Sequence, residues 1–172
     1  ERSSDVGVDG DQTDNMFEGA GAVYVFRRVD GSWSQEAYLK ASTTREFHQF
    51  GGSVDIDGDV IVVGAPGDDS DSTGVDGDEA NDRASGSGAA YVFRRSNGVW
   101  AQEAYLKASN TRASELFGSA VAVSGDRIAV GAILERSNAQ GINGNQANTL
   151  CPSGCGAVYA FQRDNGVWSQ DA

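Results

Sequence analysis

The chain has 172 residues, of which 39% are hydrophobic and 9% aromatic, so it is long and apolar enough for one ordinary domain with a sizeable core. Its formal net charge of -12 excludes nucleic acid and anionic lipid as natural partners, because both are polyanions. No apolar run approaches the ~20 residues that span a bilayer, so we expect no membrane insertion.

An internal repeat of about 67 residues organises the whole chain. The block GAVYVFRRVDGSWSQEAYLKAS at Gly21–Ser42 returns as GAAYVFRRSNGVWAQEAYLKAS at Gly88–Ser109, and in shorter form at Gly156–Ala172. A second block, FGGSVDIDGDVIVVGAP at Phe50–Pro66, returns as FGSAVAVSGDRIAVGAI at Phe117–Ile133. We therefore divide the chain into a half unit at 1–42, a complete unit at 43–109 and a nearly complete unit at 110–172.

The complete unit predicts four strands. Strand one, Gly52–Ile56, and strand two, Val60–Ala65, are joined by a tight turn at Asp57-Gly58. Strand two is a continuous apolar run, which is typical of a strand buried on both faces. A long polar loop, Pro66–Ser87, leads to strand three at Ala89–Arg95. Strand four, Trp100–Ala108, follows a hairpin turn at Asn97-Gly98.

Four strands joined by hairpins every 67 residues predict one antiparallel sheet per repeat. A lone sheet of this kind cannot bury both faces, whereas radial stacking around an axis can, so we predict an all-β β-propeller built from four-stranded antiparallel blades. The aromatic residues that recur in every repeat are expected to pack between blades. The arginine pairs that end the third strands, Arg27-Arg28 and Arg94-Arg95, are expected to form weak ion pairs at the surface.

These blocks resemble the FG-GAP repeat of integrin alpha chains and of many bacterial extracellular proteins. The resemblance rests on Phe50-Gly51 followed by Gly64-Ala65-Pro66, and on the Tyr-Val-Phe and Tyr-Leu-Lys-Ala-Ser segments of strands three and four. It implies a propeller on a secreted or surface protein. Many family members hold calcium in the turn between strands one and two. Here that turn is too short for the six to eight oxygens that calcium takes, so we expect no metal there.

The acidic residues gather instead in the long loops between strands two and three, which carry a shared Gly-Val-Asp-Gly-Asp pattern. Calcium prefers such oxygen ligands. The candidate ligands are Asp68, Asp69, Asp71, Asp76 and Asp78 in the second unit, and Asp5, Asp9 and Asp11 in the first. Two alternatives stay open: solvated acidic loops, or Asp side chains that close turns on their own backbone. In the third unit asparagines, Asn143 and Asn145, take the matched positions.

The only two cysteines, Cys151 and Cys155, lie in Cys-Pro-Ser-Gly-Cys, and we predict that they form a local disulfide. Two cysteines cannot supply the about four ligands of a structural zinc site. A disulfide implies an oxidising compartment, which agrees with an extracellular location. Two free thiols in a cytosolic protein are the alternative.

By count the chain holds ten strands, or two and a half blades, fewer than the about four blades of the smallest closed propellers. It is a piece of a longer chain, a subunit that completes its half-blades through self-association, or a repeat that stacks into a fibre. No nucleophile motif lies near the single histidine, His48, and we expect no enzyme activity. We predict an extracellular module for adhesion or protein recognition. A structural filament or sheath subunit is the first alternative, and a propeller-scaffold lyase or hydrolase is the weaker one.

Overall fold

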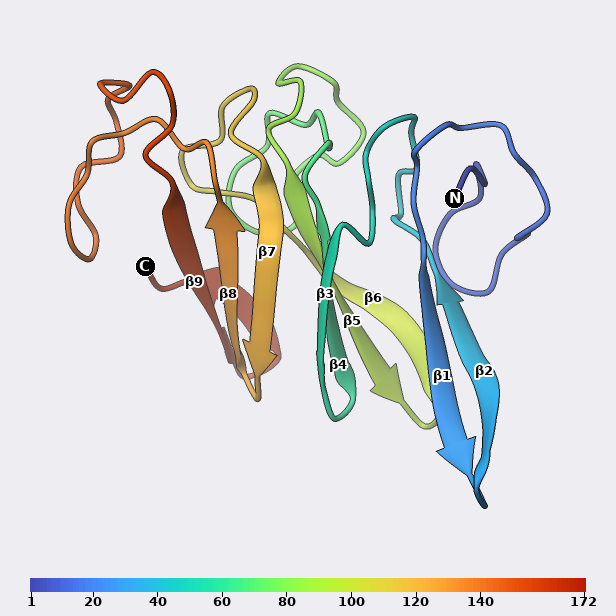
Figure 1. Cartoon of the computed structure of the whole chain (residues 1–172). Helices are drawn as coiled ribbons and strands as arrows, with labels where there is room; N and C mark the ends of the chain where they lie inside the picture. The colour runs from blue at the N-terminus through green and yellow to red at the C-terminus, as the bar shows by residue number, and fades with distance from the viewer.

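The computed structural model describes residues 1–172 and contains ten β-strands (Figure 1). It contains no helix with the length and apolar character that crossing a membrane requires. The strands are β1 (Val23–Val29), β2 (Ser32–Leu39), β3 (Ser53–Asp57), β4 (Val60–Ala65), β5 (Ala89–Ser96), β6 (Val99–Leu106), β7 (Phe117–Ser124), β8 (Arg127–Ala132), β9 (Ala157–Asp164) and β10 (Val167–Gln170).

The strands form three antiparallel sheets that follow the repeat. The first sheet contains β1 and β2, the second has the order β3-β4-β5-β6, and the third has the order β7-β8-β9-β10. The predicted four-stranded unit is therefore confirmed for the second and third sheets. The turn between β3 and β4 was predicted one residue too early: Asp57 still pairs with Val60, and Gly58 supplies the positive φ that the two-residue loop needs. The three sheets lie side by side and do not close into a ring (Figure 1).

The middle strand of the second sheet is the most buried element. All six residues of β4 are buried, because β3 and β5 cover its edges and the neighbouring sheets cover its faces. The apolar run at Val60–Ala65 thus occupies the interior position that its composition predicts. One core cluster lies between the first and second sheets, around Phe50 and Tyr91, and the other lies between the second and third, around Phe117 and Tyr159. The recurrent aromatic residues of the second and third sheets therefore pack between sheets, as predicted, whereas those of the first sheet, Tyr24, Phe26 and Trp33, are 43%, 55% and 68% exposed.

Each pair of neighbouring sheets is also joined through the main chain. Isolated parallel bridges connect Gly21 with Phe50 and Gly88 with Phe117. Gly88 has a φ of +83°, and a Cβ atom on it would lie 2.0 Å from the carbonyl oxygen of Phe117. Only glycine fits this approach, which explains the glycine before the third strand in the first two repeats, since a Cβ on Gly21 would lie equally close to the Phe50 carbonyl oxygen.

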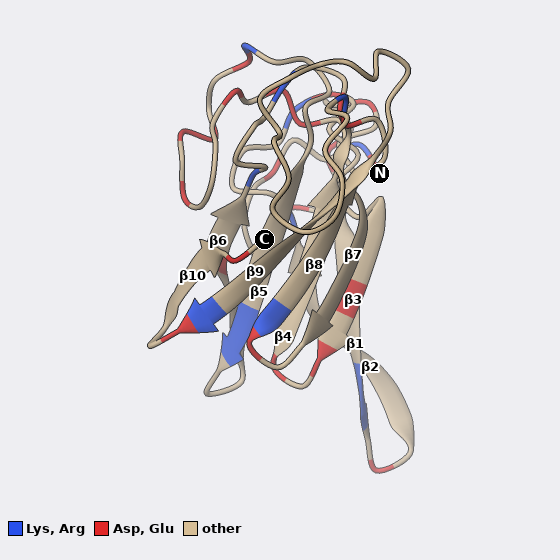
Figure 2. Ribbon diagram, turned by 90° about the vertical axis from the view of Figure 1, so that its left-hand side faces the viewer, with Lys and Arg blue, Asp and Glu red and all other residues tan.

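A glutamate on strand four of one sheet bonds the next sheet. Glu36 accepts hydrogen bonds from Arg95, at 2.7 Å, and from the indole of Trp100, at 3.3 Å. One repeat later Glu103 accepts from Arg163 and from Trp168, both at 2.9 Å. In Figure 2, basic residues lie on β5 and β9, at the strand ends opposite the long loops. The arginines were predicted to form weak surface pairs. Arg95 does pair with acids, with Asp59 at 2.6 Å and with Glu36 at 2.7 Å, but its side chain is only 22% exposed and the Glu36 contact joins two sheets.

Candidate functional site

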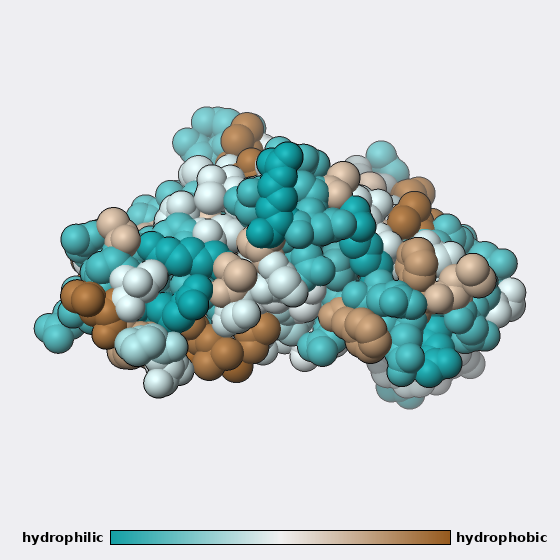
Figure 3. Space-filling view, turned by 90° about the horizontal axis from the view of Figure 1, so that it is seen from above, coloured by the Kyte–Doolittle hydropathy of each residue, from teal (hydrophilic) through white to brown (hydrophobic).

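The long loops between the second and third strand of each repeat gather on one side of the molecule, opposite the hairpin turns (Figure 1). We call this side the loop face; it comprises residues 1–22, 66–88 and 133–156. Seen from above, it is mostly hydrophilic with separate hydrophobic patches (Figure 3). This is the side on which the predicted acidic residues lie, and we take it as the candidate functional site.

A buried ion pair anchors the second loop. Asp68 and Lys107 are both fully buried, and the Lys107 Nζ lies 3.1 Å from Asp68 Oδ1. The Lys107 ammonium also donates to the hydroxyl of Ser87 at 2.7 Å. Asp68 accepts a further bond from the Tyr105 hydroxyl at 2.9 Å. Burial and the nearby carboxylate raise the pKa of Tyr105 well above its ordinary value, so this hydroxyl stays a donor. The set is a satisfied buried network that fixes the loop on its sheet.

The same arrangement occurs one repeat earlier. Lys40 Nζ lies 2.9 Å from Glu1 Oε2 and donates to the carbonyl oxygens of Ser3 and Gly21. Lys40 is fully buried, whereas the Glu1 side chain keeps 19% of its exposure. The lysines of the Tyr-Leu-Lys segments therefore act in pairs with acids at the matching loop positions.

The Gly-Val-Asp-Gly-Asp segment of the first two loops holds the end of strand four by two main-chain bonds and one bond to its first Asp side chain. Asp76 donates its backbone N–H to the Tyr105 carbonyl, at 2.8 Å, and its Oδ1 accepts the Tyr105 N–H, at 2.9 Å. The backbone N–H of Lys107 donates to the Gly74 carbonyl at 2.8 Å. We call this three-bond arrangement the strand clamp. Asp9 makes the corresponding bonds to Tyr38.

The remaining candidate ligands serve the loops' own backbone. Asp69 accepts from Gly86 N–H, Asp78 from Ala80 N–H and Asp11 from Thr13 N–H, each at 2.8 to 3.0 Å. Asp5 accepts from Val6 and Asp11, and Asp71 is exposed. The structure brings no three His, Cys, Asp or Glu side chains together in a way that could hold a metal ion. The Asx-turn alternative describes the contacts of Asp78 and Asp11, whereas Asp69 and Asp5 bond backbone groups 17 and 6 residues away. Calcium binding stays a prediction.

The predicted disulfide is present in the third loop. Cys151 and Cys155 are bonded, with their Cα atoms 5.8 Å apart. The N–H of Cys151 donates to the Arg136 carbonyl, and the N–H of Cys155 to the Glu135 carbonyl. The bridge thus closes a short segment whose two ends are tied to the same stretch of chain.

His48 lies beneath the loop face, between the first two sheets, and sequence reasoning assigned it no role. It is buried, its Nδ1 is 3.9 Å from Asp68 Oδ2, and neither ring nitrogen has a hydrogen-bond partner. Burial lowers the pKa of His48, so the ring is neutral near pH 7. Its counterpart Glu115 is also buried, between Arg112 and Arg136 at 3.6 Å, and burial raises its pKa. In the sequence, this buried position can be recognised because two different ionisable residues, His48 and Glu115, occupy it in successive repeats.

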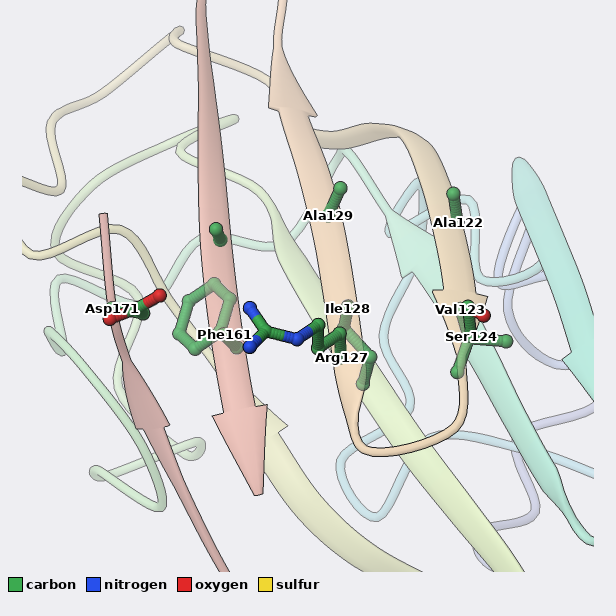
Figure 4. Close-up of a pocket in the computed structure, with 9 residues that line it drawn as sticks. Ala122, Val123, Ser124, Arg127, Ile128, Ala129, Phe161 and Asp171 are labelled. Atoms are coloured by element: carbon green, nitrogen blue, oxygen red, sulfur yellow. The ribbon is translucent and has the colours of Figure 1, made fainter. Parts of the chain in front are cut away.

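A shallow cavity of about 240 Å³ lies away from the loop face, on the outer side of the third sheet (Figure 4). Ala122, Ala129 and Ala160, which face away from the core, give it an apolar floor, and Arg127 and Asp171 lie at its rim. Its position corresponds to the side of the second sheet that the third sheet covers. The cavity therefore lies on a face that packs against the next sheet in the preceding repeat, and no set of polar groups converges in it.

The repeated four-stranded unit and its clamped loops define an all-β repeat protein. The FG-GAP repeat family matches residues 33–93 and 100–148, which is more than half of the chain. The chain belongs to the FG-GAP repeat family, as its Phe-Gly and Gly-Ala-Pro segments indicate. FG-GAP repeats are typical of protein-interaction or adhesion domains, and the disulfide fits their usual extracellular setting. No curated protein sequence is significantly similar to this chain.

Proposed function

We propose that this chain is a non-catalytic segment of an extracellular β-propeller that binds another protein through the loop face. Family membership supports a role in protein interaction. The side-by-side sheets, joined by a repeated glutamate–arginine–tryptophan contact, support their assignment as propeller blades. The disulfide supports an oxidising location.

The observation that carries the proposal is a set of exposed apolar side chains on loops that are held in place. Met16, Ile142 and Leu150 keep 71%, 86% and 71% of their exposure. Their loops are fixed by buried pairs, the strand clamp or the disulfide, so little ordering entropy is lost when a partner binds. Exposed apolar groups on a preorganised frame are suited to act as anchors in a protein interface.

The non-catalytic part of the proposal is supported by how the acidic groups are used. The buried carboxylates of the loop face pair with lysines and tyrosine hydroxyls of their own repeats. They hold the fold and lie below the surface that a substrate could reach. A calcium ion that stiffens the exposed loops is a further part of the proposal, and it is tested by the chelator experiment below.

The test compares one triple-site variant with one double-site control, both of which replace exposed apolar side chains with serine. One replaces the loop-face anchors Met16, Ile142 and Leu150 with serine. The control replaces Val99 and Val167, which are 67% and 68% exposed at the turn side, with serine. Binding of each protein to a panel of immobilised extracellular proteins is measured by surface plasmon resonance. We expect loss of binding for the loop-face variant alone. Equal behaviour of the two variants, or no binding by the parent chain, would contradict the proposal.

A filament or sheath subunit is the second candidate, and one observation favours it. Trp33 is 68% exposed, whereas its counterparts Trp100 and Trp168 are 4% exposed beneath a glutamate of the preceding sheet. At the other end, Asp171 occupies the position of those glutamates. Copies stacked head to tail would bring Asp171 onto Trp33 of the next copy. Sedimentation of Trp33→Ala, with Val99→Ala as control, tests this: a mass independent of concentration in the parent chain would exclude it.

A further inference from the structure

We infer that Phe47, in the linker between β2 and β3, is an anchor that enters an apolar pocket of the partner protein, and that basic residues rim this pocket. The linker spans residues 40–52 and arches between the first two sheets, on the side of the long loops (Figure 1). The inference rests on the proposed function, because it names the chemistry of the partner that the loop face binds.

The backbone holds Phe47 in a conformation that bulky residues avoid. Its φ is +60°, in the left-handed region, where a large side chain is strained. The Phe47 N–H donates to the Glu18 carbonyl at 2.7 Å. On the other side, a Cβ atom on Gly67 would lie 2.0 Å from the Phe47 carbonyl oxygen, so the two backbones are in close contact. The first and second loops therefore fix this residue between them.

The matched position of the next repeat shows that the fold requires this conformation but not an aromatic side chain. Ser114 has a φ of +64°, and its N–H donates to the Ser85 carbonyl in the same way. The loops on both sides of Ser114 belong to the chain, and Ser114 is exposed, so this position of the repeat lies at the surface when both loops surround it. The backbone therefore gives no reason for phenylalanine at position 47.

Packing within the chain gives no reason either. Phe47 is 57% exposed and belongs to neither core cluster. Its ring lies over Gly19, where a Cβ atom would be 3.2 Å from it, and the rest of the side chain faces solvent. Strained residues persist where they serve a function, and aromatic anchors carry much of the binding energy of protein interfaces. A rigidly held, exposed aromatic side chain is suited to fill a pocket of a partner.

The charges beside Phe47 define the rim of that pocket. Glu46 is exposed and forms no ion pair, whereas Ala113 takes its place one repeat later. The linker's own arginine, Arg45, is already paired with Asp82 at 2.8 Å. The loops that flank Phe47 contain six acids with one arginine and seven acids with one arginine, and a buried lysine neutralises one acid in each. Lysine or arginine at the pocket rim complements this field.

The first test uses a small host of the same chemistry as a probe. A β-cyclodextrin whose primary hydroxyls are replaced by ammonium groups has an apolar cavity for an aromatic ring and a basic rim. It is titrated into the 172-residue chain with isotope-labelled phenylalanine rings, and the ring signals are followed by NMR. The controls are unmodified β-cyclodextrin and Phe26, which is 55% exposed on β1 beside the exposed Arg27.

We expect the charged host to bind at Phe47 at least about 5-fold more tightly than the neutral host, and at Phe26 no more tightly than the neutral host. The variants Phe47→Ser and Phe26→Ser assign the two signals. Phe47→Ser is expected to fold, because serine occupies the same backbone geometry at position 114. Equal affinity of the two hosts for Phe47, or no binding of either host there, would overturn the inference.

The second test repeats the plasmon resonance panel with the same two variants. A panel protein that binds the parent chain should bind Phe47→Ser at least about 10-fold more weakly and Phe26→Ser equally well. Unchanged binding of Phe47→Ser would overturn the inference and leave the proposed function in place. A parent chain that binds no panel protein would contradict the proposed function and, with it, this inference.

Discussion

Replacement of Lys107 by methionine tests the buried ion pair most directly, because the same substitution can be made one repeat earlier. Methionine keeps much of the lysine stem but removes the ammonium that bonds Asp68 and Ser87. Asp68 is fully buried, so its charge would remain without a cation and without water. Breaking a buried pair in this way costs about 3–5 kcal/mol.

The matched variant is Lys40→Met. Here the remaining acid, Glu1, keeps 19% of its side-chain exposure and can regain water, so we expect a smaller loss of about 1–2 kcal/mol. The difference between the two losses isolates the effect of burying the partner. Urea unfolding at pH 7, followed by tryptophan fluorescence, gives both free energies.

A third variant, Lys107→Met combined with Asp68→Leu, removes both charges. We expect it to be more stable than Lys107→Met alone, since no charge is left buried. The reasoning is refuted if Lys107→Met costs less than about 1 kcal/mol. It is equally refuted if the double variant loses as much free energy of unfolding as the sum of the losses of Lys107→Met and Asp68→Leu measured singly.

Four further outcomes can be measured on the same chain. Gly88→Ala should cost about 3 kcal/mol or more, because its Cβ would meet the Phe117 carbonyl, whereas Gly98→Ala, with open space at a similar φ of +81°, should cost about 1 kcal/mol; similar losses in urea unfolding would count against the close approach. As pH falls below 6.5, unfolded His48 gains a proton that the buried ring resists, so the free energy of unfolding should fall, and His48→Gln should show a smaller fall between pH 7.5 and 5.5. Reduction of the bond between Cys151 and Cys155 should cost about 2 kcal/mol or less, since the closed segment is short, with unchanged far-UV circular dichroism. If the loops hold calcium, a chelator should lower the melting midpoint, and an unchanged midpoint would remove the calcium proposal.

The strands could be predicted because the sequence determines them locally. Asn97-Gly98 sets a hairpin, and the apolar run at Val60–Ala65 requires cover on both faces, which only the middle of a sheet stack provides. The recurrence of aromatic residues likewise predicted packing between sheets, and the prediction holds for the second and third sheets, while Tyr24, Phe26 and Trp33 of the first sheet are exposed.

The charge contacts could not be predicted in the same way. Whether Arg95 stays in solvent or reaches Glu36 depends on how two sheets sit, and no local pattern records that. The buried lysines were missed for another reason: lysine is seldom fully buried, so Lys107 was taken for part of a family motif. The available signal was the equal spacing of Lys40 and Lys107 and of Glu1, Asp68 and Glu135. Residues of opposite charge that recur with the same spacing along the sequence can lie next to each other in each copy of the repeat.

The disulfide loop also shows where this repeat tolerates a change of length. The third copy carries one residue more than the second, and the matched bonds of Asn148 and of Asn81 place the addition after Asn148, in the segment that Cys151 and Cys155 close. The strands on both sides keep their pairing. A foreign peptide inserted between these two cysteines would be displayed on the loop face with its ends held together, which makes this segment the natural grafting point if the chain is used as a scaffold.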